Sequence, residues 1–168
     1  MSSNTAPPSP RFHAISLTVA AVAAVATLGT NFAMLPAPAM FLGWVAFDLA
    51  GPSPRGGLAN IGSFLLGLAF GAGTALATTW LTPMFGPLAA PTAVAGVVVL
   101  VLSLRGLPPL NNPLAYFLGL SSFFYSGLAP NGSTLLILGA AGVIGGAACA
   151  AATMAQNAVI RTSNPRPA

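Results

Sequence analysis

Residues 41–56 read FLGWVAFDLAGPSPRG, and residues 117–132 read FLGLSSFFYSGLAPNG. Both stretches fit the ungapped pattern F-L-G-x3-F-x3-G-x2-P-x-G when the chain is shifted by 76 positions. Further matches lie on both sides of this block, such as Leu28 with Leu104. The amino-acid composition does not account for a block of this length, and we therefore predict that the chain is built from two structural repeats.

The composition indicates a membrane protein. Hydrophobic residues make up 55% of the 168 residues and charged residues only 4%, whereas a soluble domain has about 25% charged residues. The chain has one acid, Asp48, and one cysteine, Cys149, which we interpret as a small packing residue. We therefore expect no enzymatic activity, no metal and no cofactor, because paired ionisable groups are scarce. The arginines are scattered singly, which argues against nucleic-acid binding.

The apolar segments differ in length. Four of them reach the ~17–25 residues that cross a bilayer, and they are residues 14–34, 58–80, 88–104 and 134–160. Two shorter segments begin with prolines and are either short spans or re-entrant half-helices, namely residues 35–50 and 110–126. We predict four regions, which are a disordered tail (1–12), membrane repeat 1 (13–82), membrane repeat 2 (83–160) and a disordered tail (161–168).

The arginines favour six crossings over four. With a cytoplasmic N-terminus, six crossings place every arginine on the cytoplasmic side, which are Arg11, Arg55, Arg105, Arg161 and Arg166. Re-entrant short segments would move Arg55 and Arg105 outside. Three crossings per repeat is an odd number, so the second repeat must enter from the opposite face. We therefore predict an all-α membrane protein with six transmembrane segments arranged as two three-helix inverted-topology repeats, the middle helix of each being short.

The N-terminal segment has a second interpretation. Arg11, the apolar residues 14–28 and the small residues 37–39 could form a cleavable signal peptide. We expect the segment to be retained, because its removal would leave the second repeat without a complete structural partner.

One stretch resembles a known family. FLGWVAF at residues 41–47, followed by Gly56, Gly57 and Asn60, is similar to the bacterial inner-membrane family called domain of unknown function 1097. The resemblance implies a multi-pass inner-membrane protein without an established activity. Independently of this resemblance, the arginine distribution predicts that both termini are cytoplasmic. Asp48 departs from the family's aromatic or small residue, so the family supports no role for it.

A shorter resemblance concerns residues 111–114, which read NNPL. This segment looks like the Asn-Pro segment of urea transporters, which are also built from inverted repeats. The first half of the chain has PAP at residues 36–38 in the corresponding place.

The proline-led helix starts are candidate solute sites. A helix that begins at Ala37 or Asn112 would present unpaired backbone N–H groups at its positive end. Asn111 and Asn112 would add amide groups that can replace water around a polar solute, although Asn112 could also simply cap its helix. We expect the solute path to include residues from both repeats, which are Asn111, Asn112, Pro113, Pro38, Trp44, Asp48, Phe41 and Phe117.

Several of these candidates have a structural alternative. Asp48 is either a functional ionisable residue facing a cavity or an interfacial residue that reaches water or pairs with Arg55, and we favour the second interpretation. The aromatic residues that recur every three positions could constrict a channel, but helix packing or lipid contact is the commoner role. Small-x3-small patterns predict close helix packing, and they comprise Gly67, Gly71, Gly142 and Gly146.

Two functions are compatible with these features. The first is a channel or facilitator for a small neutral or weakly polar solute of unknown identity. The second is a membrane scaffold that organises partners through its small-residue faces and transports nothing. In either case we expect contact with membrane lipid and assembly into a homo-oligomer.

Overall fold

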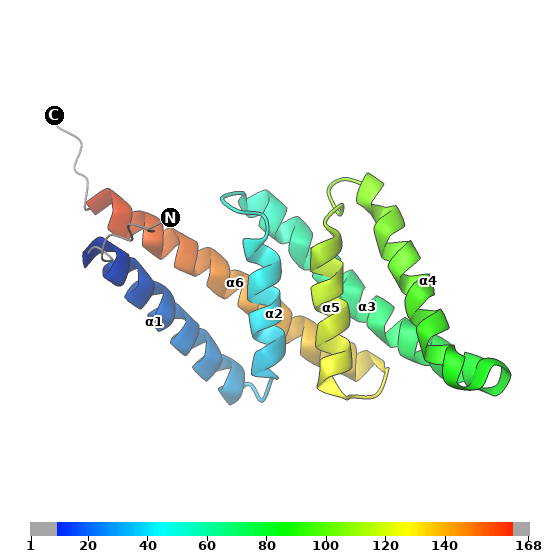
Figure 1. Cartoon of the computed structure of the whole chain (residues 1–168). Coiled ribbons are helices and arrows are strands. Elements are labelled where there is room, and N and C mark those ends of the chain that lie inside the picture. Colours follow the sequence, from blue (N-terminus) through cyan, green and yellow to red (C-terminus); the bar gives the residue numbers. More distant parts are fainter. Residues whose placement is uncertain (1–9, 163–168) are drawn as a thin grey trace, which may run out of the picture.

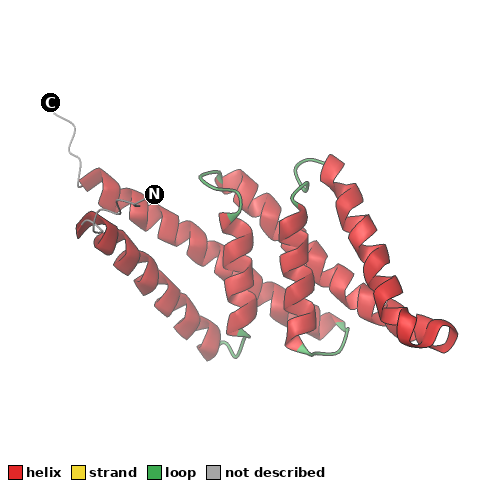
Figure 2. Cartoon of the chain, viewed as in Figure 1, coloured by secondary structure: helices red, strands yellow, loops and turns green. Residues whose placement is uncertain are grey.

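The computed structural model describes residues 10–162, which form helices joined by short connections, with no strand in that range (Figures 1 and 2). The helices are α1 (Pro10–Phe32), α2 (Ala37–Asp48), α3 (Pro54–Phe85), η1 (Gly86–Leu88), α4 (Ala89–Ser103), η2 (Leu104–Gly106), α5 (Pro113–Ser126) and α6 (Gly132–Thr162). Helix α1 begins three residues inside the predicted tail 1–12, and α6 runs two residues past position 160. Arg166 lies outside the described residues.

Capping side chains and prolines define where these helices begin. The Ser53 hydroxyl accepts a hydrogen bond from the Gly56 N–H (3.1 Å), and the Asn131 side chain accepts one from the Thr134 N–H (2.8 Å). Both residues satisfy a backbone donor that has no partner inside its helix. Helix α5 is capped in the same manner by Asn112, ahead of Pro113.

Within residues 10–162, three helical stretches are long and apolar enough to cross a membrane, and they are Arg11–Phe32, Pro54–Gly106 and Gly132–Arg161. Only 6% of the most apolar window of the first stretch is buried. Its large side chains point outward, with Leu17 and Val25 each 70% exposed. A continuous apolar surface of this kind requires a lipid environment. The chain is an all-α membrane protein.

The two longest helices, α3 and α6, contact one another and run in opposite directions, and each packs against a short helix from the other half of the chain (Figure 1). Helix α2 packs most extensively against α6, and α5 packs most extensively against α3. Helix α1 lies beside α6, whereas α4 lies beside α3. The short helices α2 and α5 also touch one another.

Glycines allow these helices to approach until their backbones touch. A Cβ at Gly43 on α2 would overlap the carbonyl oxygen of Gly142 on α6, and one at Gly145 would overlap that of Met40. In the other pair, a Cβ at Gly119 on α5 would overlap the carbonyl oxygen of Phe64, and one at Gly67 would overlap that of Tyr116. The short helices are therefore fixed to the long ones by glycine contacts, as small residues permit in membranes.

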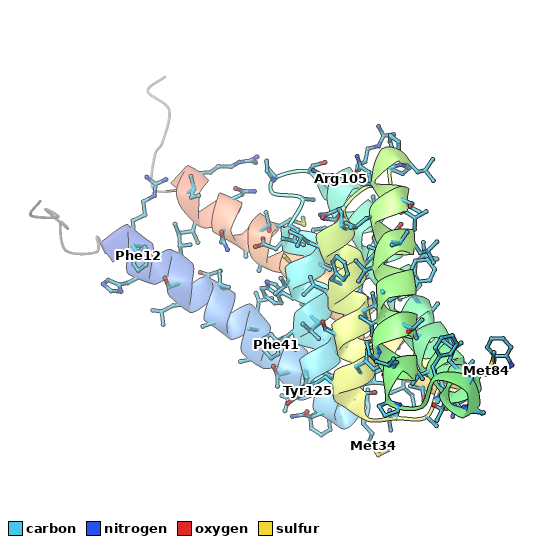
Figure 3. The ribbon with its side chains drawn as sticks, turned by 45° about the vertical axis from the view of Figure 1, so that its right-hand side comes forward. Phe12, Met34, Phe41, Met84, Arg105 and Tyr125 are labelled. Atoms are coloured by element: carbon cyan, nitrogen blue, oxygen red, sulfur yellow. The ribbon has the colours of Figure 1, made fainter. Side chains whose placement is uncertain are left out.

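The described arginines lie on one edge of the molecule. The helix ends nearest to Arg11, Arg55, Arg105 and Arg161 all lie along the upper edge in Figure 1. Figure 3 shows the labelled Arg105 at this edge and Met34, Met84 and Tyr125 at the opposite one. We refer to these edges as the arginine end and the opposite end.

Candidate functional site

An amide pair joins the start of α5 to α3. The Asn112 Nδ2 donates a hydrogen bond to the Asn60 Oδ1 at 3.2 Å, and the Asn112 Oδ1 accepts one from the Leu114 N–H, also at 3.2 Å. Asn60 is only 5% exposed. The pair therefore links a helix cap to a buried polar side chain 52 positions away in the chain.

The helix cap determines which atom of each amide faces the other. Because the Leu114 N–H requires an acceptor, Asn112 must present its oxygen to the backbone and its nitrogen to Asn60. Asn60 must then present its oxygen to Asn112. Its Nδ2 is left without a hydrogen-bond partner within the described chain, although it is buried. Such a donor is costly unless something else accepts from it.

The amide pair lies in a cleft of about 730 Å³ at the arginine end, which we call the amide cleft. The cleft is bounded by the end of α2, the start of α3, the end of α4 and the start of α5. Its lining residues are Leu49, Ala50, Gly56, Asn60, Leu102, Arg105, Pro109, Asn111, Asn112, Pro113, Leu114 and Phe117. Its lining contains several amide groups and one guanidinium but no carboxylate.

A second cleft, of about 330 Å³, lies at the opposite end, and we call it the tyrosine cleft. It is formed by the start of α2, the end of α5 and part of α6. Its lining residues are Pro36, Pro38, Ala39, Leu42, Ser122, Tyr125, Ser126, Leu128 and Leu138. Figure 3 shows Tyr125 of this cleft and Arg105 of the amide cleft at opposite ends of the molecule.

Two buried serines also lack hydrogen-bond partners. Ser63 is fully buried on α3, one helical turn after Asn60, and Ser122 is 3% exposed on α5 in the tyrosine cleft. Neither hydroxyl has a partner within the described chain. Unpaired buried hydroxyls are unusual, since most polar groups in protein interiors are satisfied. Together with Asn60, they give α3 and α5 uncharged hydrogen-bonding groups at buried positions.

The prediction that the short helices expose free backbone N–H groups is wrong for four of these groups, two at the start of each helix. At α5 the Leu114 N–H bonds the Asn112 side chain and the Ala115 N–H bonds the Asn112 carbonyl. At α2 the Ala39 and Met40 N–H groups both reach the carbonyl of Pro36. Prolines remove further donors because they carry no N–H. These four N–H groups are therefore not free to bind a solute.

The structure divides the predicted path residues into three groups. Asn111, Asn112, Pro113 and Phe117 lie together in the amide cleft, whereas Pro38 lies in the tyrosine cleft. The remaining three line neither cleft, and they are Phe41, Trp44 and Asp48. The predicted path residues are therefore not one continuous surface.

The aromatic residues of α2 change from lipid-facing to buried along the helix. Phe41 is 44% exposed, Trp44 packs at the edge of the hydrophobic core, and Phe47 is 8% exposed. On α5 the corresponding Leu120 and Phe123 are 7% and 3% exposed. These side chains mainly fill the interface between helices.

Asp48 ends α2 at the arginine end, and it is solvent-exposed. The Cys149 Sγ donates to its Oδ1 at 3.7 Å, whereas no ion pair with Arg55 forms among the described residues. Within residues 10–162, no cluster of His, Cys, Asp or Glu has the composition of a metal site.

The four glycines of the small-x3-small patterns are all buried inside the chain. Gly67 and Gly71 face α5, where they meet the Tyr116 backbone and the Phe123 side chain. Gly142 and Gly146 lie on α6 against the side chains of Phe64 and Ile61 of α3. Both patterns are therefore occupied by contacts within the chain.

Comparison with known proteins identifies the family. Residues 16–158 match the family described as "Protein of unknown function (DUF1097)". The chain belongs to this family. The DUF1097 match covers all six α-helices in whole or in part, including both clefts. No curated protein and no solved structure matches the chain, so the local similarity to urea transporters gains no support.

Proposed function

We propose that this DUF1097 protein is a six-span inner-membrane protein, built from two inverted repeats, that provides a path for a small neutral or weakly polar solute. Both termini and all arginines would lie on the cytoplasmic side. The amide cleft would then open to the cytoplasm and the tyrosine cleft to the opposite side.

The exchange of short helices between the two halves supports the inverted repeats. Helix α2 of the first half packs on α6, as α5 of the second half packs on α3. Figure 1 shows α2 running from the opposite end to the arginine end, whereas α5 runs the other way. The long helices α3 and α6 also run in opposite directions. A two-fold axis in the membrane plane relates elements in this manner.

Equivalent contacts indicate a gap in the repeat alignment. The short helices correspond at an offset of 76, since Met40 and Tyr116 make the same contact, each through its carbonyl oxygen. The long helices correspond at an offset of 78, because Gly67 and Gly145 receive those two carbonyls. The capping residues Ser53 and Asn131 also differ by 78 positions. The second repeat therefore has two additional residues between Tyr116 and the cap of its long helix, and they agree with the greater length of α5, which has 14 residues against 12 in α2.

The gap changes which residues correspond in the long helices. Arg55 corresponds to Ser133 at an offset of 78, instead of to Asn131. The division of charge between the repeats is unchanged, because neither residue of the second repeat is charged.

The short helices are too short to cross the hydrocarbon layer alone. Helix α2 has 12 residues and α5 has 14, which correspond to about 18 and 21 Å at the standard rise. The hydrocarbon layer is about 30 Å thick. Irregular backbone at membrane depth is tolerated where it is buried in protein or lines an aqueous cavity. A cleft at each end of the α2–α5 pair meets this requirement, and it supports access to the centre from both sides.

The polar groups along α3 and α5 favour an uncharged solute. The buried donors and hydroxyls without partners belong to Asn60, Ser63 and Ser122, and none is ionisable in the physiological range. The only acid, Asp48, lies outside both clefts. A buried ion would need a countercharge or several converging dipoles. Neutral hydrogen-bonding groups suit a solute that carries no net charge.

Solute flux into proteoliposomes tests this function. Purified protein should accelerate entry of at least one of urea, short amides, water or ammonia above that of protein-free liposomes. Ser122→Ala should reduce the flux, whereas Ser121→Ala, a matched change at an exposed neighbouring serine, should leave it unchanged. Absence of flux for every solute would favour the scaffold function instead.

The scaffold alternative requires a surface for partners. The four glycines proposed for that surface pack within the chain, so a scaffold would have to use other faces. Helices α1 and α4, on the outside of the bundle, offer such faces to a second copy of the chain (Figure 1). We retain the homo-oligomer as part of the proposal, and a monomer on gel filtration in mild detergent would contradict it.

A further inference from the structure

The geometry points to Asn60 as the solute-recognition residue, whose Nδ2 donates a hydrogen bond to the carbonyl oxygen of a small neutral amide in the amide cleft. This inference rests on the proposed solute path and adds a substrate class to it. Asn112 is the positioning residue that holds Asn60 in the required orientation.

The first step is the fixed orientation of the pair. The Leu114 N–H, Asn112 and Asn60 form a chain of hydrogen bonds in which each acceptor and donor is assigned by its neighbour. Reversing either amide would place two donors or two acceptors opposite one another. The Asn60 Nδ2 is therefore held as a donor without a partner inside the protein, at a residue that lines the cleft. Its complement is an oxygen acceptor.

The second step concerns the charge of that acceptor. The guanidinium in the cleft belongs to Arg105, which is solvent-exposed after the end of α4. A carboxylate could bind near this rim, but Ser63, the next buried polar residue along α3, brings only a neutral hydroxyl. A neutral carbonyl loses less hydration than an ion when it moves inward. An amide also carries N–H groups that can donate hydrogen bonds to serine hydroxyls.

The third step is the difference between the two clefts. At the offset of 78, Asn60 of the amide cleft corresponds to Leu138 of the tyrosine cleft, which is 1% exposed. Ser63 similarly corresponds to Ala141, which is fully buried. The two repeats therefore place a donor in one cleft and a leucine in the other. The amide donor is therefore present only in the cleft at the arginine end.

Two variants separate recognition from folding. Asn60→Leu copies the residue at the corresponding position and removes the donor. Asn112→Asp preserves the cap on Leu114 but presents a second acceptor, so Asn60 must turn and donate to it. Asn60 then offers an oxygen to the solute without having been mutated. Asn131→Ser is the matched control, because serine caps the corresponding helix α3.

Flux of acetamide and water is measured for each protein in proteoliposomes. We expect both Asn60→Leu and Asn112→Asp to lower acetamide flux roughly five- to tenfold, as for loss of one hydrogen bond, and to change water flux less than twofold. Asn131→Ser should match the wild type in both. Equal acetamide flux in Asn112→Asp and the wild type, with both folded by circular dichroism, would overturn the inference while leaving the path intact.

A binding measurement does not depend on flux. In protein labelled with 15N-asparagine, acetamide should shift the Asn60 side-chain resonances, and acetate at the same concentration should shift them less. Asn112→Asp should abolish the acetamide shift. If the wild type shows this pattern without any flux, the proposed path fails and the recognition site stands. A stronger response to acetate, or no response to acetamide, would overturn the site.

Discussion

Gly43 on α2 packs directly against the backbone of Gly142 on α6, with no space for a side chain on Gly43. The equivalent contact in the other pair joins Gly119 on α5 to the carbonyl of Phe64 on α3. Each short helix is therefore attached through its glycine to a long helix of the other half. We therefore expect the stability of the protein and the position of both clefts to depend on these two contacts.

Substitution of these glycines should destabilise the protein. Gly43→Ala and Gly119→Ala would each force a methyl group into backbone atoms of the neighbouring helix, at a cost of about 1–3 kcal/mol for overpacking. Gly73→Ala on α3 is the matched control, because nothing lies within 4 Å of its Cβ position. The control should be neutral or slightly stabilising, since alanine favours helices. Thermal unfolding in detergent measures the difference, and equal midpoints for all variants would contradict it.

The six crossings predict opposite exposure of two loop residues. Ser53 and Ala129 are both exposed, and they lie in the loops that follow α2 and α5. In a Cys149→Ala background, Ser53→Cys should react with an impermeant thiol reagent only after the cytoplasmic face is opened. Ala129→Cys should react in intact spheroplasts. Labelling of both residues from the same face would rule out inverted repeats.

Neutralising the only acid should have little effect. Asp48→Asn retains an oxygen that can accept from Cys149, and Asp48 is exposed at the end of α2. We expect a change of less than about 0.5 kcal/mol in unfolding free energy, as is usual for surface sites. Solute flux and its pH dependence should equal those of the wild type. A shifted pH profile would identify Asp48 as a proton-linked group and favour a coupled transporter.

The cap of α6 should contribute measurably to stability. Asn131→Ala removes the acceptor of the Thr134 N–H, with an expected loss of about 1 kcal/mol. Asn131→Ser should restore most of that loss. Unfolding midpoints of the two variants test the assignment, which fails if alanine and serine behave alike.

Much of the fold could be predicted from the sequence because apolar segment length and helix-start residues act locally. The predicted segment 88–104 lies within one residue of α4 at each end, and residues 110–126 contain α5. The long helices begin earlier than their predicted limits, since Ser53 and Asn131 cap them ahead of the apolar segments. The shared F-L-G block locates the two short helices, where its glycine makes the backbone contacts.

The candidate site was harder to predict because its partners are distant in sequence. Asn60 stands alone in an apolar stretch, and only the fold brings Asn112 to it. The sequence did contain one signal, namely a single amide residue among the apolar residues of a long span. The expectation of free N–H groups failed at Ala39, Met40, Leu114 and Ala115 because it did not consider the nearby carbonyl and side-chain acceptors.

The two-residue gap between the repeats has a practical consequence for any reconstruction of a common half-length ancestor. Two residues turn an α-helix by about 200°, so an ungapped superposition pairs Asn60 with Leu136, which is 76% exposed. A half-chain inferred from that pairing would direct its asparagine toward the hydrocarbon tails. With the gap included, the ancestral choice at this position becomes asparagine or leucine, and a symmetric homodimer of either version could be built and assayed.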